Sequence, residues 1–140
     1  MEKLLSIAIP CYNSQDYMEK AITSLLDEKE DIEILLVDDG SKDNTGIIGD
    51  SYASRYPGTI ISLHQENGGH GEAVNTGIRY ASGKYFKVLD SDDWFDKKAF
   101  KKVIEQLKTL EENKQEVDMM VVNYVYEKPS ENKQSVIRYK

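Results

Sequence analysis

The sequence alternates short apolar runs with segments whose apolar residues recur at helical spacing, and this alternation restricts the possible folds most. Strand-like runs occupy 4–10, 32–37, 59–65, 84–90 and 117–127. Helix-like segments occupy 14–26, 43–56, 69–81 and 96–110. The run at 32–37 is almost continuously apolar, which is typical of a strand buried on both faces. We therefore predict an α/β fold, with a mainly parallel sheet and helices on both faces.

Capping residues define the expected ends of the helices. Side chains able to cap a helix N-terminus stand before three of the helical segments: Asn13 or Ser14, then Asp43, Asn44 or Thr45, and finally Asp96. Gly83 is expected to end the helix at 69–81, because glycine commonly closes helices.

The length and charge of the chain limit its class. At 140 residues it fits one domain, whose core is large enough to fold without disulfides or structural metals. The net charge of −7 argues against a nucleic acid as partner, because such binding depends on Lys and Arg neutralising phosphates. From Glu127 onward the chain is polar and contains Pro129, so 127–140 is expected to be a loop or tail.

The compartment is predicted from cysteine usage and hydropathy. Cys11 is the only cysteine, so no disulfide forms within the chain, which fits a reducing compartment. No apolar run approaches the roughly 20 residues that cross a bilayer, and the N-terminus lacks a signal-peptide pattern. We expect no transmembrane segment in this chain and a cytoplasmic location.

Three carboxylates follow the apolar run at 84–90: Asp90, Asp92 and Asp93. Acids at positions i and i+2 on irregular backbone can converge on one cation, and carboxylate oxygens suit Mg²⁺ or Mn²⁺. Alternatively, they could cap the next helix and stabilise its positive end, although Asp96 is better placed for that role. Spacing alone leaves both interpretations open.

Polar residues also follow the first and second strands. Tyr12 could stack on a nucleobase, or it could pack in the core while Asn13 caps a helix. Asp38 and Asp39 could accept hydrogen bonds from a sugar hydroxyl or a base N–H, or they could simply form a turn with Gly40. Because ligands of open parallel sheets bind beyond the carboxyl ends of the strands, these positions are candidate site residues.

A glycine-rich segment at 66–77 precedes the third helix. Its glycines indicate unusual backbone angles or a ligand close to the backbone, but their spacing fits neither the Walker pattern nor the dinucleotide pattern. His70, which stands between glycines, is a better candidate for a ligand contact than His64. Two histidines without a cysteine partner are weak evidence for zinc.

Taken in order, the segments SIAIPCYN, ILLVDDGSKDNT and ENGGHGEAVNTGIRYASGKYFKVLDSDDW resemble the family 2 glycosyltransferases of the GT-A fold. The resemblance covers roughly 4–100. It implies binding of a nucleotide-diphosphate sugar, most often a UDP-sugar, together with Mn²⁺ or Mg²⁺. Asp92 matches the principal metal ligand, Asp90 a ribose or metal contact, Tyr12 the residue against uracil, and Asp39 the acid that bonds the base. The other implied nucleotide-binding residues are Pro10, Asn13, Asp38, Asn67, Gly68, His70, Asn75 and Ser91.

The chain departs from the family pattern at two points. Val74 stands where many members have an arginine, just before Asn75. The family's catalytic base and acceptor site lie downstream, beyond Lys140, so no catalytic residue is assigned here. We therefore expect 1–126 to be the donor-binding domain of a metal-dependent inverting glycosyltransferase, with 127–140 leading to the acceptor-binding part. The isolated chain is not expected to transfer sugar efficiently.

The resemblance also implies partners and leaves alternatives. The implied acceptor is a glycan or a lipid-linked molecule, with envelope glycans of a bacterial type as the expected class, reached at the inner face of the membrane through peripheral contact by the missing part. A non-catalytic nucleotide-sugar-binding module is the alternative, and it fits the absent base. A sugar-phosphate nucleotidyltransferase would need an early glycine-rich loop with Arg and Lys, and a receiver domain would need its acid pair after the first strand.

Overall fold

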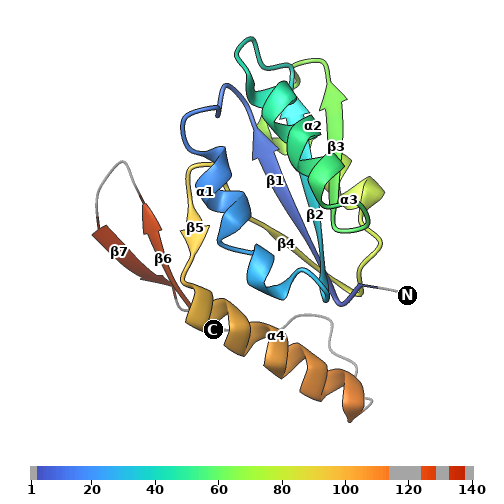
Figure 1. The fold of residues 1–140 in the computed structure, drawn as a ribbon, viewed down its shortest axis with the longest axis vertical. Helices are drawn as coiled ribbons and strands as arrows, with labels where there is room; N and C mark the ends of the chain where they lie inside the picture. Colours follow the sequence, from blue (N-terminus) through green and yellow to red (C-terminus); the bar gives the residue numbers. More distant parts are fainter. Residues whose placement is uncertain (1–2, 114–123, 129–132, 138–140) are drawn as a thin grey trace.

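The computed structural model describes residues 3–113, 124–128 and 133–137. Its centre is a parallel sheet in the order β3-β2-β1-β4 (Figure 1). The strands are β1 (Leu5–Cys11), β2 (Ile32–Asp39), β3 (Ile60–Gln65) and β4 (Tyr85–Val88). β1 and β2 run in register from the pair Leu5 and Ile32 to the pair Cys11 and Asp38. The predicted α/β class with a mainly parallel sheet is confirmed.

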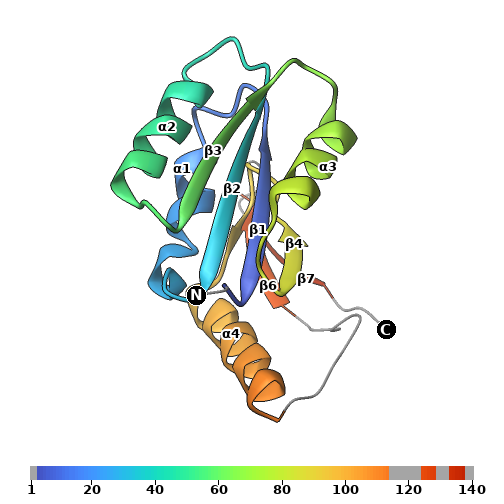
Figure 2. The same ribbon diagram turned by 90° about the vertical axis from the view of Figure 1, so that its right-hand side faces the viewer.

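Helices cover both faces of this sheet. Figure 2 shows α1 (Met18–Thr23) and α2 (Thr45–Arg55) on one face and α3 (His70–Tyr80) on the other. The two central strands are therefore almost completely buried, and Ile7, Ile9 and Ile34 are 0% exposed. This burial explains the nearly continuous apolar run in β2, because neither face of the strand meets water.

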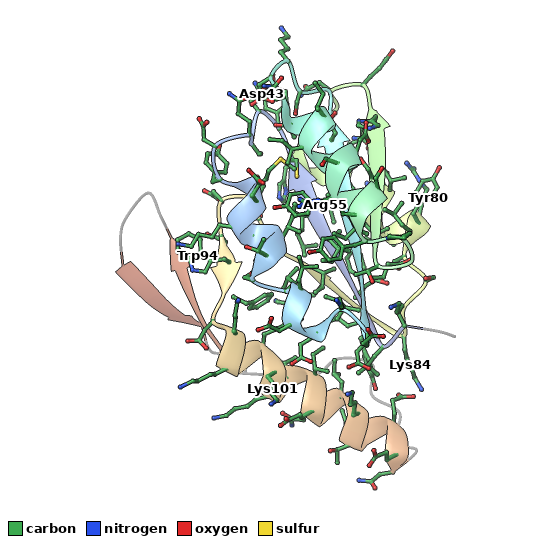
Figure 3. All side chains as sticks on the ribbon, viewed as in Figure 1. Asp43, Arg55, Tyr80, Lys84, Trp94 and Lys101 are labelled. Carbon is green, nitrogen blue, oxygen red and sulfur yellow. The ribbon has the colours of Figure 1, made fainter. Side chains whose placement is uncertain are left out.

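A fourth helix, α4 (Lys97–Glu112), crosses the foot of the sheet (Figure 1). The Asp96 side chain accepts hydrogen bonds from the backbone N–H groups of Lys98 (2.8 Å) and Ala99 (3.0 Å), as the sequence predicts. The buried stripe of this helix consists of Phe100, Ile104 and Leu107. Figure 3 shows Lys101 directed away from the body of the protein on the opposite side of α4.

The first helix is shorter than predicted. Of the expected range 14–26, only Met18–Thr23 is α-helical, and a 3₁₀ turn, η1, follows at Leu26–Glu28. Neither Asn13 nor Ser14 caps it with a side chain. Both side chains bond elsewhere, because Asn13 accepts from the backbone N–H of Lys42 and the Ser14 hydroxyl bonds Ser91.

α2 begins where the sequence predicts it, with Asn44 at the cap position. The Asn44 side chain makes no capping bond, and Asp43, another of the predicted capping residues, accepts from the backbone N–H of Thr45 at 2.9 Å. The end of the next helix differs from the prediction. α3 ends at Tyr80 rather than at Gly83. The Gly83 N–H bonds the Ser6 hydroxyl at 2.8 Å, so this glycine joins the chain to β1 instead of closing the helix.

A second, antiparallel sheet contains β5 (Trp94–Phe95), β6 (Tyr124–Lys128) and β7 (Lys133–Ile137) in that order. The sequence did not predict β5, and a loop or tail was expected where β7 lies. Backbone pairing with β6 explains both strands, because hydrogen bonds between strands do not require apolar side chains. Of the strand predicted at 117–127, residues 117–123 lie outside the described residues. The domain boundary after 126 stays a prediction.

Trp94 is 9% exposed on β5, beside α1 (Figure 3), where the Lys20 ammonium lies 4.1 Å from the ring centroid. It therefore belongs to the packed part of the molecule. Within the described ranges, none of the helices has the length and apolar character that a bilayer crossing requires.

Candidate functional site

A pocket of about 470 Å³ opens at the carboxyl ends of β1, β2 and β4. This volume lies within the usual range for small-molecule sites, about 300–1,000 Å³. It brings together eight residues predicted from the sequence: Pro10, Tyr12, Asp39, Asn67, His70, Asp90, Ser91 and Asp92. The location follows from the topology, because the carboxyl ends of parallel strands meet at one edge of the sheet.

The other four predicted residues lie outside the lining of this pocket. Asn13 and Asp38 hold the neighbouring loop, accepting from the backbone N–H groups of Lys42 and Ser41, each at 2.9 Å. Gly68 donates its N–H to Asp39, so it acts through that carboxylate. Asn75 is exposed on α3.

The acidic cluster lies in a tight turn after β4. The N–H of Asp93 donates to the carbonyl of Asp90 at 3.0 Å, and this bond closes a turn that brings the three acids together. Carboxylate oxygens of Asp90, Asp92 and Asp93 lie within 4.8 Å of one another. Asp90 and Asp92 are exposed, whereas Asp93 is 5% exposed.

This donor set fits a hard divalent cation. Oxygen ligands about 2.1 Å from Mg²⁺ stand at most about 4.2 Å apart, so small rotations of the exposed carboxylates would bring them into range. The alternative role as helix caps loses its support, because Asp96 alone makes the α4 capping bonds. His70 approaches from α3, with its Nε2 3.2 Å from an oxygen of Asp90.

Asp39 is 4% exposed and receives four hydrogen bonds from its own chain. Its Oδ1 accepts from Gln65 Nε2 (2.8 Å) and Gly68 N (2.9 Å). Its Oδ2 accepts from Gly69 N (2.9 Å) and Asn67 Nδ2 (3.3 Å). A carboxylate offers about four acceptor positions, so the bond from Asn67, the longest, is the one that a ligand N–H would most easily replace.

Hydrogen bonding also fixes the charge of Asp39. Burial alone would raise its pKa, but the bonds from Gly68, Gln65 and Gly69 outweigh burial and lower the pKa below its ordinary value. The carboxylate is therefore an anion that fastens the glycine-rich loop to the end of β2. Gly69 adopts φ 97°, a left-handed conformation that glycine reaches without strain.

The N-terminus of α3 begins at this loop, and both Gly69 and His70 line the pocket. Because unpaired N–H groups and the helix dipole favour anions at a helix N-terminus, this wall suits a negatively charged ligand. Tyr12 also lines the pocket and is 47% exposed, so it is not a core residue. An exposed aromatic ring beside an anion site suits a nucleotide.

Cys11 also lines the pocket but is not a suitable nucleophile. Burial, followed by the negative charge of Asp38, raises the pKa of its thiol to about 12. Only the thiolate is reactive, so this cysteine is inert at neutral pH.

A second polar cluster lies on the outer edge of the sheet. His64 Nδ1 is 2.9 Å from Asp38, and the Ser62 hydroxyl is 3.5 Å from His64 Nε2. These residue types resemble a nucleophile, base and acid, but Asp50 binds the same Nε2 at 2.7 Å and also accepts from Ser62 at 2.8 Å. The imidazole is therefore held between two carboxylates and cannot take a proton from the serine.

Sequence reasoning missed some residues of the site. Ser14 and Tyr17 line the pocket. Gln65 lies outside the lining and orients Asp39 through the hydrogen bond from its Nε2. Ser14 could have been suspected from its position shortly after β1. Nothing local indicated Gln65, because its partners Asp39 and Thr76 come from β2 and α3.

A family model described as Glycosyl transferase family 2 matches residues 6–136. The chain belongs to this family. It is 36% identical over 120 residues to the minor teichoic acid biosynthesis protein GgaB of Bacillus subtilis strain 168, covering 84% of this chain and 13% of that protein. It is 42% identical over 107 residues to the uncharacterized glycosyltransferase EpsJ of the same organism, covering 76% of this chain and 31% of that protein. The chain therefore spans less than half the length of these curated relatives.

Solved structures agree with this membership. The structure of Staphylococcus aureus TarS 1-349 in complex with UDP-GlcNAc matches with a TM-score of 0.68 and 27% identity, over 77% of this chain and 32% of that one. The mannosyltransferase PcManGT from Pyrobaculum calidifontis, solved with GDP-Man and Mn²⁺, matches with a TM-score of 0.65. At 21% identity, the second likeness shows the shared fold alone. The family 2 chain thus has the GT-A architecture that its sequence resembles.

Proposed function

We propose that this family 2 chain is the donor-binding part of a metal-dependent inverting glycosyltransferase and binds a UDP-sugar in the pocket. One observation carries the proposal: an exposed aromatic ring, a buried anion that can accept an N–H, and an acidic cluster all line the same cavity. Those features are Tyr12, Asp39 and the turn at 90–92. The UDP-GlcNAc complex of TarS, a structural relative, supports the choice of nucleotide.

Each feature has a defined task in this proposal. Tyr12 stacks on the base, and Asp39 accepts the imide N–H of uracil after exchanging the bond from Asn67. The N-terminus of α3 faces the diphosphate. Asp90 and Asp92 would hold Mn²⁺ or Mg²⁺, and the ion, when bound, supplies positive charge that stabilises the departing nucleotide.

Electrostatics explain why a cation belongs here. A carboxylate about 4 Å from a phosphate charge costs about 4 kcal/mol at an effective dielectric near 20. Two exposed acids beside the proposed diphosphate would therefore prevent binding unless a divalent ion separated the like charges. The net charge of −7 on the chain adds to this requirement.

The acceptor belongs to the same proposal. A glycan or a lipid-linked molecule of a bacterial envelope is supported by the relative named for minor teichoic acid biosynthesis. A cytoplasmic location at the inner membrane face fits a nucleotide-sugar donor and the single reduced cysteine. Both concern the whole enzyme, of which this chain represents the donor side.

Calorimetric titration with UDP tests the donor site, first with MnCl₂ and then with a chelator. We expect binding with Mn²⁺ to be more than about tenfold tighter than without it, since the ion would offset a repulsion of about 4 kcal/mol for each pair of carboxylate and phosphate charges. Asp92→Asn should abolish this metal-dependent gain. Asp27→Asn removes the same charge from the exposed η1 turn and should leave it intact. Equal UDP affinity with and without Mn²⁺ would contradict the proposed role of the acids.

A further inference from the structure

The buried hydroxyl of Ser14 connects two parts of the pocket, the segment that contains Tyr12 and the acidic turn that contains Ser91. Ser14 is 1% exposed, and its Oγ lies 2.7 Å from the hydroxyl of Ser91, which stands 77 positions away in the sequence. The same Oγ accepts the backbone N–H of Tyr12 at 3.1 Å and lies 3.3 Å from the Tyr12 carbonyl. Ser14 thus touches both the segment that carries the aromatic ring and the turn that carries the acids.

The backbone of Ser14 is fixed independently of its side chain. Its N–H donates to the Thr45 hydroxyl at 2.7 Å. Its carbonyl accepts from the N–H groups of Tyr17 and Met18 at 3.1 and 2.9 Å. Removing the hydroxyl therefore leaves this anchor in place, and it deletes the link to Ser91 together with the local bond from the Tyr12 N–H.

Ser91 occupies a sensitive position in the acidic turn. It lies between Asp90 and Asp92, inside the turn closed by the bond from Asp93 N to Asp90 O. The orientation of this residue sets the directions in which the two flanking carboxylates leave the backbone. When Ser14 donates its proton to Ser91, the Ser91 hydroxyl keeps its own proton available for an oxygen atom in the pocket.

We infer that Ser14 is a positioning residue that couples nucleotide binding at Tyr12 to cation binding at the acidic turn. The inference rests on the proposed function. A base that stacks on Tyr12 fixes the segment at 12–14, and Ser14 passes this order to Ser91 and so to Asp90 and Asp92. The coupling is reciprocal by thermodynamic linkage, so the cation must favour the nucleotide by the same factor.

The test measures the factor by which saturating Mn²⁺ tightens UDP binding to the 140-residue chain. We expect Ser14→Ala to lower this factor about five- to tenfold, the amount one hydrogen bond commonly contributes. UDP affinity in chelator should change less than about twofold, since neither Tyr12 nor Asp39 loses a side-chain contact. Ser91→Ala removes the bond to Ser14 and keeps the bond from the Tyr12 N–H, and it should also lower the factor. The double variant should be no worse than Ser14→Ala, because both single variants remove the bond between the two hydroxyls.

Ser24→Ala is the matched control. Ser24 is also buried, 6% exposed, and its hydroxyl also accepts a backbone N–H, from Phe95 at 3.2 Å, but it lies outside the pocket lining. It should cost comparable thermal stability and leave the coupling factor unchanged.

Three outcomes would decide against the inference. Ser14→Ala could weaken UDP equally with Mn²⁺ and with chelator, the Ser14 and Ser91 effects could add, or Ser24→Ala could lower the factor as much. Failure of the unmodified chain to bind UDP under either condition would instead overturn the proposed function, and the inference with it.

Discussion

Single side chains in this protein act through the charges that surround them, and His64 is the best-defined example. Its two ring nitrogens lie 2.9 Å from Asp38 and 2.7 Å from Asp50, so one imidazole joins β2, β3 and α2. The hydrogen bonds to Asp38 and then Asp50 raise its pKa above the ordinary 6.5, while partial burial opposes them. The bond from His64 likewise lowers the pKa of Asp50.

This shift predicts a pH-dependent stability. Because the folded-state pKa of His64 is raised, its contribution is fully present below pH 6.5 and is lost as pH rises through the folded pKa. We expect the free energy of unfolding of wild type to exceed that of His64→Gln most at about pH 6 and to approach it by about pH 9. Urea unfolding at several pH values measures the difference, and a constant gap across this range would contradict the role of the protonated ring.

At the scale of elements, helices and strands could be predicted where the residues that determine them are close together in the sequence. The α4 cap needs only Asp96 and the two N–H groups that follow it, so it could be predicted from the sequence. The first helix could not, because Ser14 is held by Thr45 and Ser91, far along the chain. β5 and β7 were missed for the same reason, since each depends on pairing with β6.

The candidate site divides in the same way. Tyr12, Asp90 and Asp92 could be predicted because each follows a strand that is apparent in the sequence, and the pocket contains all of them. The four hydrogen bonds that the Asp39 carboxylate accepts could not be predicted. They depend on Gln65 and the 67–69 loop, whose positions beside β2 are set by the packing of β3 and α3.

Helix α3 packs close to the sheet because of one glycine. A methyl group on Gly77 would lie 2.6 Å from Cβ of Ala8 in β1, a distance that forces the helix away. We expect Gly77→Ala to reduce the free energy of unfolding by about 1–3 kcal/mol, the usual cost of overpacking. Gly71→Ala in the same helix meets no atom within 4 Å, so it should be neutral or stabilise by up to about 1 kcal/mol. Urea unfolding of both variants provides the comparison, and equal effects would refute the close approach at Gly77.

At the scale of the whole molecule, two buried carboxylates lie near opposite ends of the central strand β2. Asp39 lies at the pocket end, and Glu33, 6% exposed, lies at the opposite end. Glu33 accepts from the Ser6 hydroxyl at 2.6 Å, the Ser82 N–H at 2.9 Å and the Ser82 hydroxyl at 2.8 Å. One carboxylate therefore joins β1, β2 and the connection from α3 to β4.

We predict that Glu33 contributes to the stability of the fold and not to nucleotide binding. Glu33→Ala leaves the buried Ser6 hydroxyl and the two donors of Ser82 without their acceptor, so unfolding should become easier by about 2–4 kcal/mol. UDP affinity of the folded variant should stay within about twofold of wild type, because Glu33 lies outside the pocket lining. Chemical denaturation and calorimetry on the same sample separate the two effects. An unchanged unfolding midpoint would contradict this account.

The pocket draws its lining from the ends of β1 and β2 and from segments that follow β1, β3 and β4. A chain leaving the ribosome has synthesised Tyr12 and Asp39 long before Asp92, and β4 must then enter the sheet beside β1, the first strand made. The proposed donor binding would therefore require the completed sheet. A bound nucleotide would stabilise the assembled sheet against unfolding as a unit, by about 2.7 kcal/mol at a hundred times its dissociation constant.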